Sequence, residues 1–474
     1  MFGAIAVGHA AGAPPAVPLP TEVGSALARA KVPADALSVV VRSVGGIDDG
    51  VDWRGSAAVN PASLMKLATT YAALELLGPS WTWSTSVWLQ GRLRDAGPEG
   101  VLDGDLVIKG QGDPKLVLER VWLLLRRVRQ AGVREIRGDI VLDRSAFVVG
   151  EQSPADFDGE PLRPYNARPD ALLLNYKSLL ITFMPEPARG SARVVVEPAL
   201  AGVRVDASVP LRPAPCEDWR GGLQLDATDP LHLRFKGSYP AACGEQTWPL
   251  AYPDPDSYGA RLIAALWRDA GGVLAGVVRD GRAPQGVAPE FEFSSPPLAE
   301  VVRDINKYSN NLMAQQLFLT LGLHFKGSGS APAAREVLLG WLRDKLGAQA
   351  AEVEIDNGSG LSREARVSAD ALALLLQRAW ASPVMPEFVA SLPISGLDGT
   401  LRRSTALSAA GRAHLKTGSL RDVVAVAGYL LAPDGRRYVL VAIVNHPRAA
   451  AARPALDALV EWAMSARGQA ALGR

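Results

Sequence analysis

The chain has 474 residues, of which 48% are hydrophobic and 21% charged, so it can bury a large core and form more than one domain. Its 50 Lys and Arg residues nearly balance 49 Asp and Glu residues, and no long basic run occurs, which argues against nucleic-acid binding. The five histidines and two cysteines form no triad signature, H-E-x-x-H motif or Cys-rich cluster. We therefore expect a globular protein without a metal site or a cofactor.

Residues 1–20 are interpreted as the remainder of a signal peptide. A short apolar run leads to Ala11-Gly12-Ala13, a small-x-small pattern typical of signal-peptidase sites, and Pro-rich sequence follows. The segment lacks a basic start, so an apolar disordered tail is the alternative. No uninterrupted apolar stretch of about 18 residues follows, so we expect no transmembrane segment.

The first predicted elements are a helix over 21–31 and a strand over 37–46. A second helix is expected to begin near Pro61, because Asn60 is a plausible N-cap, proline suits the first helical position, and apolar residues follow at helical spacing. Residues 90–285 differ in character, since short β-type runs alternate with Gly and Pro.

From about residue 295 helical patterns return, and the chain ends in two or three strands, with a turn at Pro433-Asp434-Gly435, and a final helix. The sequence thus places one strand before the helix near Pro61 and a hairpin at the chain end, with helices between them. This order predicts an α+β domain whose antiparallel sheet is assembled from both chain ends. The β-rich middle section would be an insertion into this domain.

The two cysteines, Cys216 and Cys243, lie in a loop-rich stretch with several Pro and Gly residues. They could form one disulfide if the protein is exported to an oxidising compartment. A pair of unrelated buried thiols is the alternative.

Ser63 and Lys66 are three positions apart at the expected helix start, so their side chains project from one face within hydrogen-bonding reach. A serine hydroxyl becomes a strong nucleophile when a neighbouring base takes its proton, and lysine is such a base only when neutral. The pKa of Lys66 must therefore fall, through burial or a second nearby cation. A lone S-x-x-K pattern arises easily by chance, so its meaning depends on further motifs.

Two further motifs follow in chain order. Ser309-Asn310-Asn311 forms S-x-N within a helical stretch, and Lys416-Thr417-Gly418 forms K-T-G at the start of a predicted strand. Each of the three patterns occurs only once. The ordered set is typical of class A β-lactamases and penicillin-binding proteins, which predicts acyl transfer through a serine nucleophile.

The chemistry assigns a role to each motif residue. Ser63 is expected to attack an acyl carbonyl, Lys66 to act as its base, and Lys416 to lower the pKa of Lys66 and to attract an anionic substrate. Ser309 can relay a proton to the leaving amine, while Asn311 offers its amide to the substrate or to Lys66.

The residues after Lys416 are expected to contact the substrate. Thr417 is positioned to bind a terminal carboxylate, and the backbone N–H groups of Ser63 and Ser419 would form the oxyanion hole. Gly418 would let the substrate approach the strand edge closely.

With these motifs, the sequence resembles the low-molecular-mass class C penicillin-binding proteins of peptidase family S13, which are D-alanyl-D-alanine carboxypeptidases and endopeptidases. The 242 residues between Lys66 and Ser309 resemble the two extra domains that this family inserts between its first and second motifs. The resemblance implies an α+β penicillin-binding domain, similar to that of serine β-lactamases and transpeptidases, interrupted by two inserted β-rich domains. The expected segments are 1–20 (signal remnant or tail), 21–90 and 286–474 (penicillin-binding domain), 91–178 and 255–285 (inserted domain II), and 179–254 (inserted domain III).

Other segments are similar to parts of that family, from about residue 30 to the end. By this resemblance Arg363, in DNGSGLSR, helps to shape the substrate pocket, and the DNGSG part builds a turn beside the active site. Asp143, in LDRSAF, is by resemblance the acid of the inserted domain that faces the cleft and contacts the peptide stem. The remaining matching segments are GQGDP (110–114), YNARPDALLLN (165–175) and PISGLDGTL (393–401).

Two alternatives remain weaker. A serine β-lactamase uses the same acylation but needs fast deacylation, which in class A depends on a Glu in an E-x-x-L-N segment, and here Ala171 replaces that Glu. A non-catalytic penicillin-binding or cell-wall-binding module would need neither an intact nucleophile nor a base. We therefore expect slow deacylation of penicillin.

The resemblance implies a serine DD-peptidase that removes terminal D-alanine from peptidoglycan stems and cuts D-alanyl cross-links through a Ser63 acyl-enzyme. β-Lactam antibiotics, which mimic D-Ala-D-Ala, would be covalent inhibitors, and no cofactor would take part. The expected location is the periplasm, with a loose membrane association through a surface patch left open.

Overall fold

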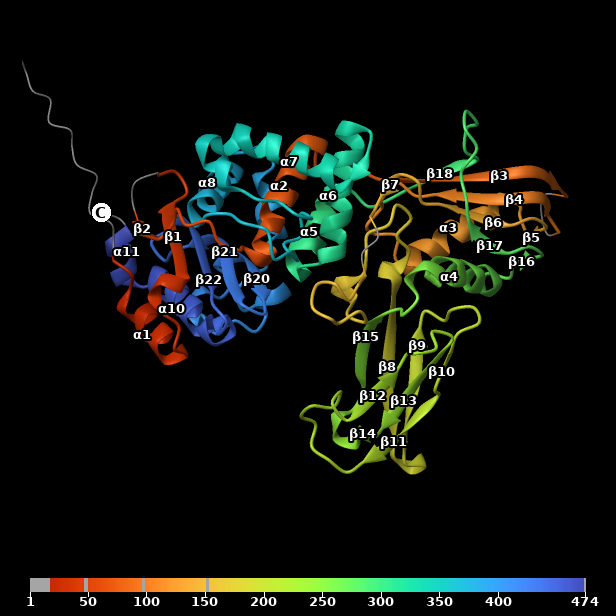
Figure 1. The fold of residues 1–474 in the computed structure, drawn as a ribbon, viewed down its shortest axis with the longest axis horizontal. Helices are drawn as coiled ribbons and strands as arrows, with labels where there is room; N and C mark the ends of the chain where they lie inside the picture. Colours follow the sequence, from red (N-terminus) through yellow and green to blue (C-terminus); the bar gives the residue numbers. More distant parts are fainter. Residues whose placement is uncertain (1–17, 47–49, 96–98, 151–152, 473–474) are drawn as a thin grey trace, which may run out of the picture. The chain divides into compact units, whose positions relative to one another are not determined.

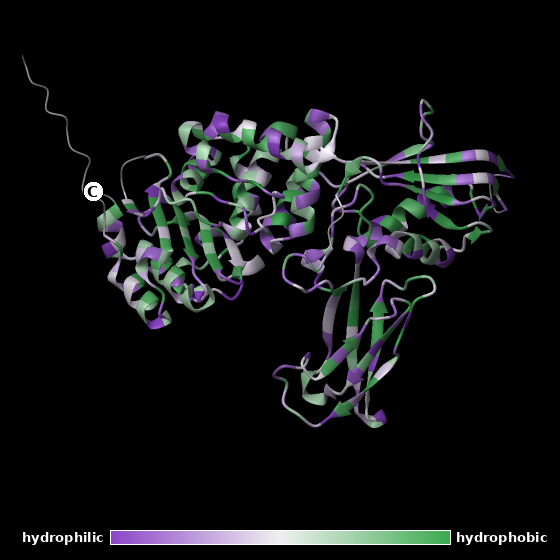
Figure 2. Cartoon of the chain, in the orientation of Figure 1, coloured by the Kyte–Doolittle hydropathy of each residue, from purple (hydrophilic) through white to green (hydrophobic). Residues whose placement is uncertain are grey.

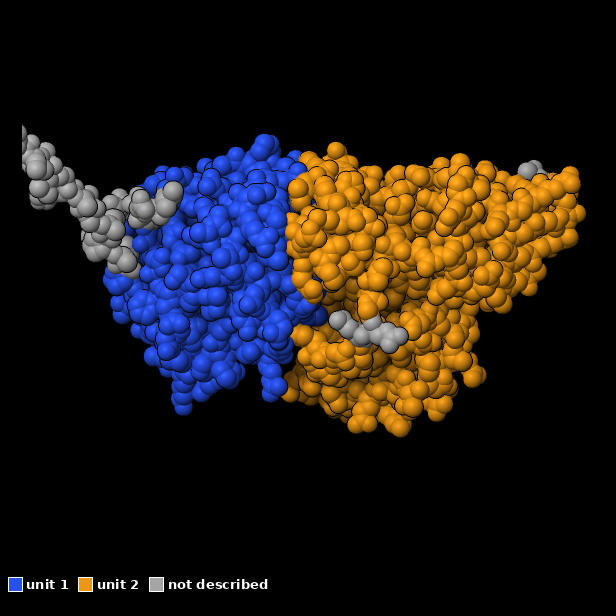
Figure 3. All heavy atoms as spheres, turned by 45° about the horizontal axis from the view of Figure 1, so that its top comes forward, with its two compact units in different colours: residues 1–75, 302–309, 339–474 blue, residues 76–301, 310–338 orange. Residues whose placement is uncertain are grey.

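The computed structural model describes residues 18–46, 50–95, 99–150 and 153–472. The signal-peptide pattern therefore lies outside the described residues. Contacts divide the chain into two units, which Figure 3 colours separately. Unit 1 comprises residues 1–75, 302–309 and 339–474, and unit 2 comprises residues 76–301 and 310–338. The expected boundaries of inserted domains II and III are finer than this division and stay a prediction.

The centre of unit 1 is a five-stranded antiparallel sheet built from both ends of the chain (Figure 1). Its order is β2-β1-β22-β21-β20, so the N-terminal strand β1 pairs directly with the C-terminal strand β22, as the sequence predicts. Strand β20, which carries the K-T-G motif, is at one edge. The bounds are β1 (Leu37–Ser43), β2 (Gly50–Trp53), β20 (Ala413–Leu420), β21 (Val423–Leu431) and β22 (Arg437–Asn445).

Helices cover both faces of this sheet, which explains why its strands are continuous apolar runs, mostly green in Figure 2. Val39 and Val41 of β1 pack against α1 and α10 on one face, while α8 contacts β1, β21 and β22 on the other. Helices α2, α5 and α7 each continue across the division between the two units. The bounds are α1 (Thr21–Ala30), α2 (Met65–Leu77), α5 (Leu298–Tyr308), α7 (Ala331–Leu346), α8 (Ala369–Trp380), α9 (Met385–Ser391), α10 (Arg453–Met464) and α11 (Ala466–Leu472).

Unit 2 contains a seven-stranded sheet covered by the amphipathic helices α3 and α4. Its main path is β16-β5-β4-β3-β18, and β6 pairs with both β4 and β17. The apolar residues Val121, Leu125 and Leu262 of the two helices pack on the strands. The bounds are β3 (Ser84–Arg94), β4 (Val101–Lys109), β5 (Glu135–Ile136), β6 (Ile140–Asp143), β16 (Val273–Leu274), β17 (Val278–Asp280), β18 (Phe291–Ser294), α3 (Leu118–Gln130) and α4 (Pro255–Asp269).

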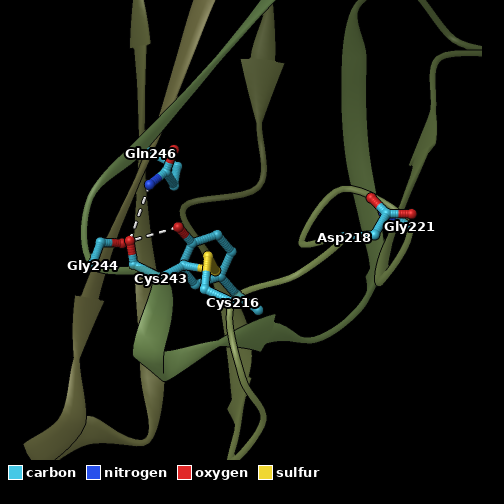
Figure 4. Close-up of a disulfide and its surroundings, with 7 residues drawn as sticks. Cys216, Asp218, Gly221, Cys243, Gly244 and Gln246 are labelled. Carbon is cyan, nitrogen blue, oxygen red and sulfur yellow. Dashed lines mark hydrogen bonds between the residues drawn. A yellow bond between two sulfur atoms is a disulfide. The ribbon is translucent and has the colours of Figure 1, made fainter. Parts of the chain in front are cut away.

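A second β-rich part of unit 2 has sheets of five and three strands around an aromatic core of Phe183, Phe235 and Tyr239. Cys216 and Cys243 form a disulfide beside this core (Figure 4). The five-stranded sheet has the order β14-β11-β9-β8-β15, and the three-stranded one β10-β13-β12. The bounds are β8 (Ser178–Glu186), β9 (Ser191–Glu197), β10 (Arg204–Val205), β11 (Ser208–Arg212), β12 (Leu223–Asp226), β13 (His232–Gly237), β14 (Tyr239–Pro240) and β15 (Gln246–Ala251); elsewhere in unit 2 lie β7 (Phe147–Val148), β19 (Gly329–Ser330) and α6 (Asn311–Lys326).

The mixture of helices and mostly antiparallel sheets confirms the expected α+β class. The middle of the chain also has the β-rich character that its short apolar runs predict. The described part of the chain contains no helix that is both long and apolar enough to cross a bilayer.

Candidate active site

The chain enters helix α2 through a tight turn rather than through the N-capped helix start that the sequence predicts. Ala62 has a φ of +47°, and residues Ala62–Leu64 form a 3₁₀ turn before α2 begins at Met65. Asn60 does not cap α2, because its Oδ1 instead accepts a hydrogen bond from the Ala62 backbone N–H at 2.9 Å. The turn places Ser63 immediately before the first α-helical residue.

The Ser63 and Lys66 side chains are hydrogen-bonded, as their spacing predicts. Lys66 Nζ donates to Ser63 Oγ at 2.9 Å and to the Ser359 backbone carbonyl oxygen at 2.6 Å. Lys66 is fully buried, and burial, followed by the positive charge of Lys416, lowers its pKa well below the ordinary value. The lowered pKa makes the neutral amine easier to reach than in an ordinary lysine, and a neutral amine beside a serine hydroxyl can accept its proton.

A second Lys–Ser pair lies close enough to influence the first. Lys416 Nζ, on β20, donates to Ser309 Oγ at 2.8 Å and to the Thr417 carbonyl oxygen at 2.6 Å. Lys416 is also fully buried, and burial lowers its pKa to about 7. The structure thus brings Ser63, Lys66, Ser309 and Lys416 together within unit 1.

The S-x-N motif lies at a break between two helices, not inside one. Helix α5 ends at Tyr308, Ser309 has a φ of +55°, and Asn310 caps α6 by accepting from the Met313 N–H at 3.0 Å. This break turns the Ser309 side chain toward Lys416. Asn311, the first residue of α6, belongs to unit 2, and its expected contact with the substrate or Lys66 stays a prediction.

Lys416 is expected to make the stability of unit 1 depend on pH. Its pKa is about 7 in the folded protein and returns toward 10.5 in the unfolded chain, so between these values the unfolded chain binds more protons. The free energy of unfolding should therefore rise with pH across this window. Lys66, whose pKa is also lowered, contributes to the rise in the same direction, so the substitution Lys416→Met should make the rise smaller without abolishing it, which urea unfolding at about pH 7 and about pH 10 measures. Equal pH dependence in both proteins would contradict this assignment.

Thr417 and Ser419 both have polar partners in unit 1. The Thr417 hydroxyl donates to Thr400 Oγ1 at 2.8 Å, and Ser419 Oγ accepts from an Arg453 guanidinium N–H at 3.1 Å. These side chains are therefore oriented before any substrate is present. Their expected substrate contacts, like the oxyanion hole, stay predictions.

Gly418 is required by the fold itself. A Cβ atom there would lie 2.9 Å from the Pro61 carbonyl oxygen and 3.3 Å from the Ala62 Cβ, so β20 packs directly against the turn before Ser63. From the sequence, Gly418 is expected to let the substrate approach the strand closely. The structure adds that it allows close approach of the chain's own first motif.

Two residues suggested by the resemblance have structural partners of their own. Arg363 forms an ion pair with Asp422 at 2.9 Å, and its side chain is 42% exposed. Asp143 is buried in unit 2, where its oxygens accept from the backbone N–H groups of Ser145 at 2.9 Å and Ala283 at 2.8 Å. Burial acts to raise the pKa of Asp143, but the hydrogen bonds outweigh it and lower the pKa. The substrate contacts of both residues stay predictions.

Sequence reasoning missed several residues that support the site. The Ser359 carbonyl binds Lys66, and Asn306 Nδ2 donates to Thr70 Oγ1 at 3.2 Å and to Ser391 Oγ at 2.9 Å, which joins α5 to α2 and α9. The glycine-rich DNGSG segment did signal a turn near the site. Thr400 lies within the PISGLDGTL segment, to which the sequence assigned no role, and no local pattern distinguishes Asn306 or Arg453, because their partners are remote in sequence.

The described residues contain no group of three or more His, Cys, Asp or Glu side chains arranged to hold a metal. The site is instead two buried lysine–serine pairs beside a strand edge. Comparison with known proteins identifies the family of the chain. Residues 19–466 match the family model described as D-Ala-D-Ala carboxypeptidase 3 (S13) family. The chain belongs to this family.

Individual relatives agree with the family assignment. The chain is 30% identical to a D-alanyl-D-alanine carboxypeptidase of an Actinomadura species, over 83% of this chain and 74% of that protein. It is 24% identical to the D-alanyl-D-alanine carboxypeptidase DacB of Haemophilus influenzae, over 83% and 82% of the two chains. The crystal structure of penicillin-binding protein 4 from H. influenzae superposes with a TM-score of 0.73 at 22% identity, covering 93% of this chain and 97% of that one.

Membership of the D-Ala-D-Ala carboxypeptidase 3 (S13) family confirms the resemblance found in the sequence and the expected enzyme class, a serine DD-peptidase. The structural match supports the penicillin-binding fold. The three motifs in this chain therefore belong to a peptidase family and not to a β-lactamase family.

Proposed function

We propose that this serine DD-peptidase acts on peptidoglycan through an acyl-enzyme formed on Ser63. The observation that carries this proposal is the buried Lys66 amine, which lies 2.9 Å from Ser63 Oγ and has a lowered pKa. Neutral Lys66 takes the hydroxyl proton while Ser63 Oγ attacks the D-alanyl carbonyl carbon, which gives a tetrahedral intermediate.

Collapse of this intermediate breaks the carbon–nitrogen bond. The proton held by Lys66 reaches the leaving nitrogen through the Ser309 hydroxyl, which Lys416 holds at 2.8 Å. A water molecule then attacks the ester carbon and gives a proton to Lys66, and Lys66 passes that proton to Ser63 Oγ as the ester bond breaks. Backbone N–H groups of Ser63 and Ser419 stabilise the oxyanion, and Asn311 and Thr417 bind the peptide.

We further propose both activities known for such enzymes: release of terminal D-alanine from peptide stems and cleavage of D-alanyl cross-links. β-Lactams acylate Ser63 because they mimic the D-Ala-D-Ala end. A complex with a β-lactam has been described for the H. influenzae relative, which supports this choice of inhibitor. In this proposal Arg363 helps to shape the substrate pocket and Asp143 contacts the peptide stem. The Asp422 carboxylate positions Arg363, and the backbone N–H groups of Ser145 and Ala283 position Asp143.

The proposed location is outside the cytoplasm, in the periplasm. The Cys216–Cys243 disulfide supports this, because disulfides persist mainly in oxidising compartments (Figure 4). A peptidoglycan substrate requires the same location.

Intact-mass measurement after incubation with benzylpenicillin tests the proposed function. We expect a stable one-to-one adduct on the wild type and on the matched control Ser408→Ala, an exposed serine elsewhere in unit 1, and none on Ser63→Ala. Penicillin consumed without an adduct would favour the β-lactamase alternative. If penicillin stays intact and no adduct forms, the proposed enzyme activity is wrong and only the non-catalytic binding module remains.

A further inference from the structure

A buried ion pair lies near the motif residue Ser309, and no step of the proposed reaction uses it. Lys307, in the last turn of α5, is only 3% exposed, and its amine donates to Asp398 Oδ2 at 2.6 Å. Both residues belong to unit 1. Burial acts to raise the pKa of Asp398, but hydrogen bonds from Lys307 and Ile394 outweigh it and lower the pKa. The charged carboxylate therefore stabilises an ammonium group that would be costly to bury alone.

The ion pair fixes the segment 393–401, which has the sequence PISGLDGTL, to the end of α5. The other carboxylate oxygen, Asp398 Oδ1, accepts from the Ile394 backbone N–H at 2.8 Å and so closes the segment into a loop. The next residue, Gly399, has a φ of +54°, and a Cβ atom there would lie only 2.5 Å from the Lys307 carbonyl oxygen. The segment is thus held against α5 both by the ion pair and by close backbone packing.

The same segment is also attached to β20, the strand that carries the K-T-G motif. Ile394 forms an antiparallel bridge with His414, and Thr400 Oγ1 accepts from the Thr417 hydroxyl at 2.8 Å. Lys416 lies between these two attachment points along the strand. The segment 393–401 therefore links the end of α5 to the part of β20 that presents the Lys416 amine.

These contacts form a closed ring that returns to Ser309. Lys307 lies two residues before Ser309 in the chain, and Lys416 donates to the Ser309 hydroxyl at 2.8 Å. Ser309 has a φ of +55°, a conformation that a residue with a side chain keeps only where its surroundings hold it. The ring runs from α5 through Asp398 and the segment 393–401 to β20, and from Lys416 back to Ser309.

We propose that Lys307 and Asp398 are positioning residues for the Ser309 hydroxyl, which delivers the proton to the leaving nitrogen. The inference rests on the proposed Ser63 acyl-enzyme and deepens it by naming the contact that holds the proton relay in place. An amine departs only after its nitrogen is protonated, whereas an alkoxide departs more easily because it is a far weaker base than an amide anion. Loss of the ion pair should therefore slow the cleavage of amides more than the cleavage of esters.

Two substrates with identical acyl parts test this role: diacetyl-L-lysyl-D-alanyl-D-alanine and the ester diacetyl-L-lysyl-D-alanyl-D-lactate. The main variant combines Lys307→Met with Asp398→Asn, so no unpaired charge stays buried, and the asparagine oxygen can still accept from the Ile394 N–H. We expect its kcat/KM to fall about tenfold to a hundredfold with the amide and less than about threefold with the ester. Asp398→Glu, which keeps the charge of the pair, should retain more of the amide rate.

Two controls separate positioning from a general loss of stability, which thermal unfolding measures in each variant. Ser309→Ala removes the relay itself and should show the same preference for the ester. Asp370→Asn removes the partner of Arg42 in another partly buried ion pair of unit 1 and should leave the ratio of the amide rate to the ester rate unchanged.

An unchanged ratio in the double variant or in Ser309→Ala would overturn the inference, and so would a changed ratio in Asp370→Asn. A wild type that cleaves neither substrate would overturn the proposed function together with the inference, which distinguishes the two failures.

Discussion

The substitution Lys66→Met is expected to lower the rate of Ser63 acylation by about 10³-fold or more while the protein remains folded. Methionine fills a similar volume but has no amine, so the Ser63 hydroxyl loses the base that lies 2.9 Å away. The buried lysine is also costly to the fold, since burial opposes its charged form. We therefore expect loss of activity without loss of thermal stability.

Acylation by a fluorescent penicillin, followed by stopped flow, measures this effect, and thermal unfolding reports on the fold. The matched control is Lys345→Met, which removes another lysine of unit 1 that is paired with Glu75 at 2.6 Å. That control should acylate at the wild-type rate. Acylation of Lys66→Met within tenfold of the wild type would mean that another group activates Ser63.

The substitution Gly360→Ala is expected to cost at least about 3 kcal/mol of stability and to impair acylation severely. Gly360 has a φ of +77°, and a Cβ atom there would lie only 1.8 Å from the Ala62 carbonyl oxygen. The chain must shift to accept the methyl group, and the atoms that shift belong to the turn before Ser63. Both the fold and the position of the nucleophile should therefore suffer.

Gly435→Ala is the matched control for the backbone conformation. Gly435 has a similar φ of +86°, but no atom lies within 4 Å of the position of its Cβ. Alanine there should cost only about 1 kcal/mol, the strain of a positive φ, and leave acylation unchanged. Denaturant unfolding and penicillin acylation of both variants separate the cost of a positive φ from the cost of the steric clash. Similar losses of stability and of acylation in the two variants would contradict the argument.

Much of the fold was predictable because its signals are local. The apolar runs at 37–46 and at the chain end predict strands, and the pairing of β1 with β22 confirms the sheet built from both ends. The start of α2 was less predictable. Asn60 and Pro61 are typical of a capped helix, yet residues Ala62–Leu64 form a 3₁₀ turn that packs closely against Gly360 and against Gly418 of β20.

The sequence by itself determined the chemistry of this protein. Three short motifs in the right order predict a serine acyl-transfer enzyme, because nucleophile and base must lie one helical turn apart and that spacing is local. The same reasoning requires a lowered pKa for Lys66. The structure shows that the pKa is lowered mainly by burial and further by the charge of Lys416.

Only the tertiary structure decided which groups complete the site. Three groups contributed by other segments complete it: the Ser359 carbonyl binds Lys66, the Thr400 hydroxyl binds Thr417, and the Arg453 guanidinium binds Ser419. None of these groups belongs to the three motifs. Burial, too, depends on everything packed around a side chain. These properties arise from long-range packing, which local patterns do not encode, so they became apparent only once the chain was folded.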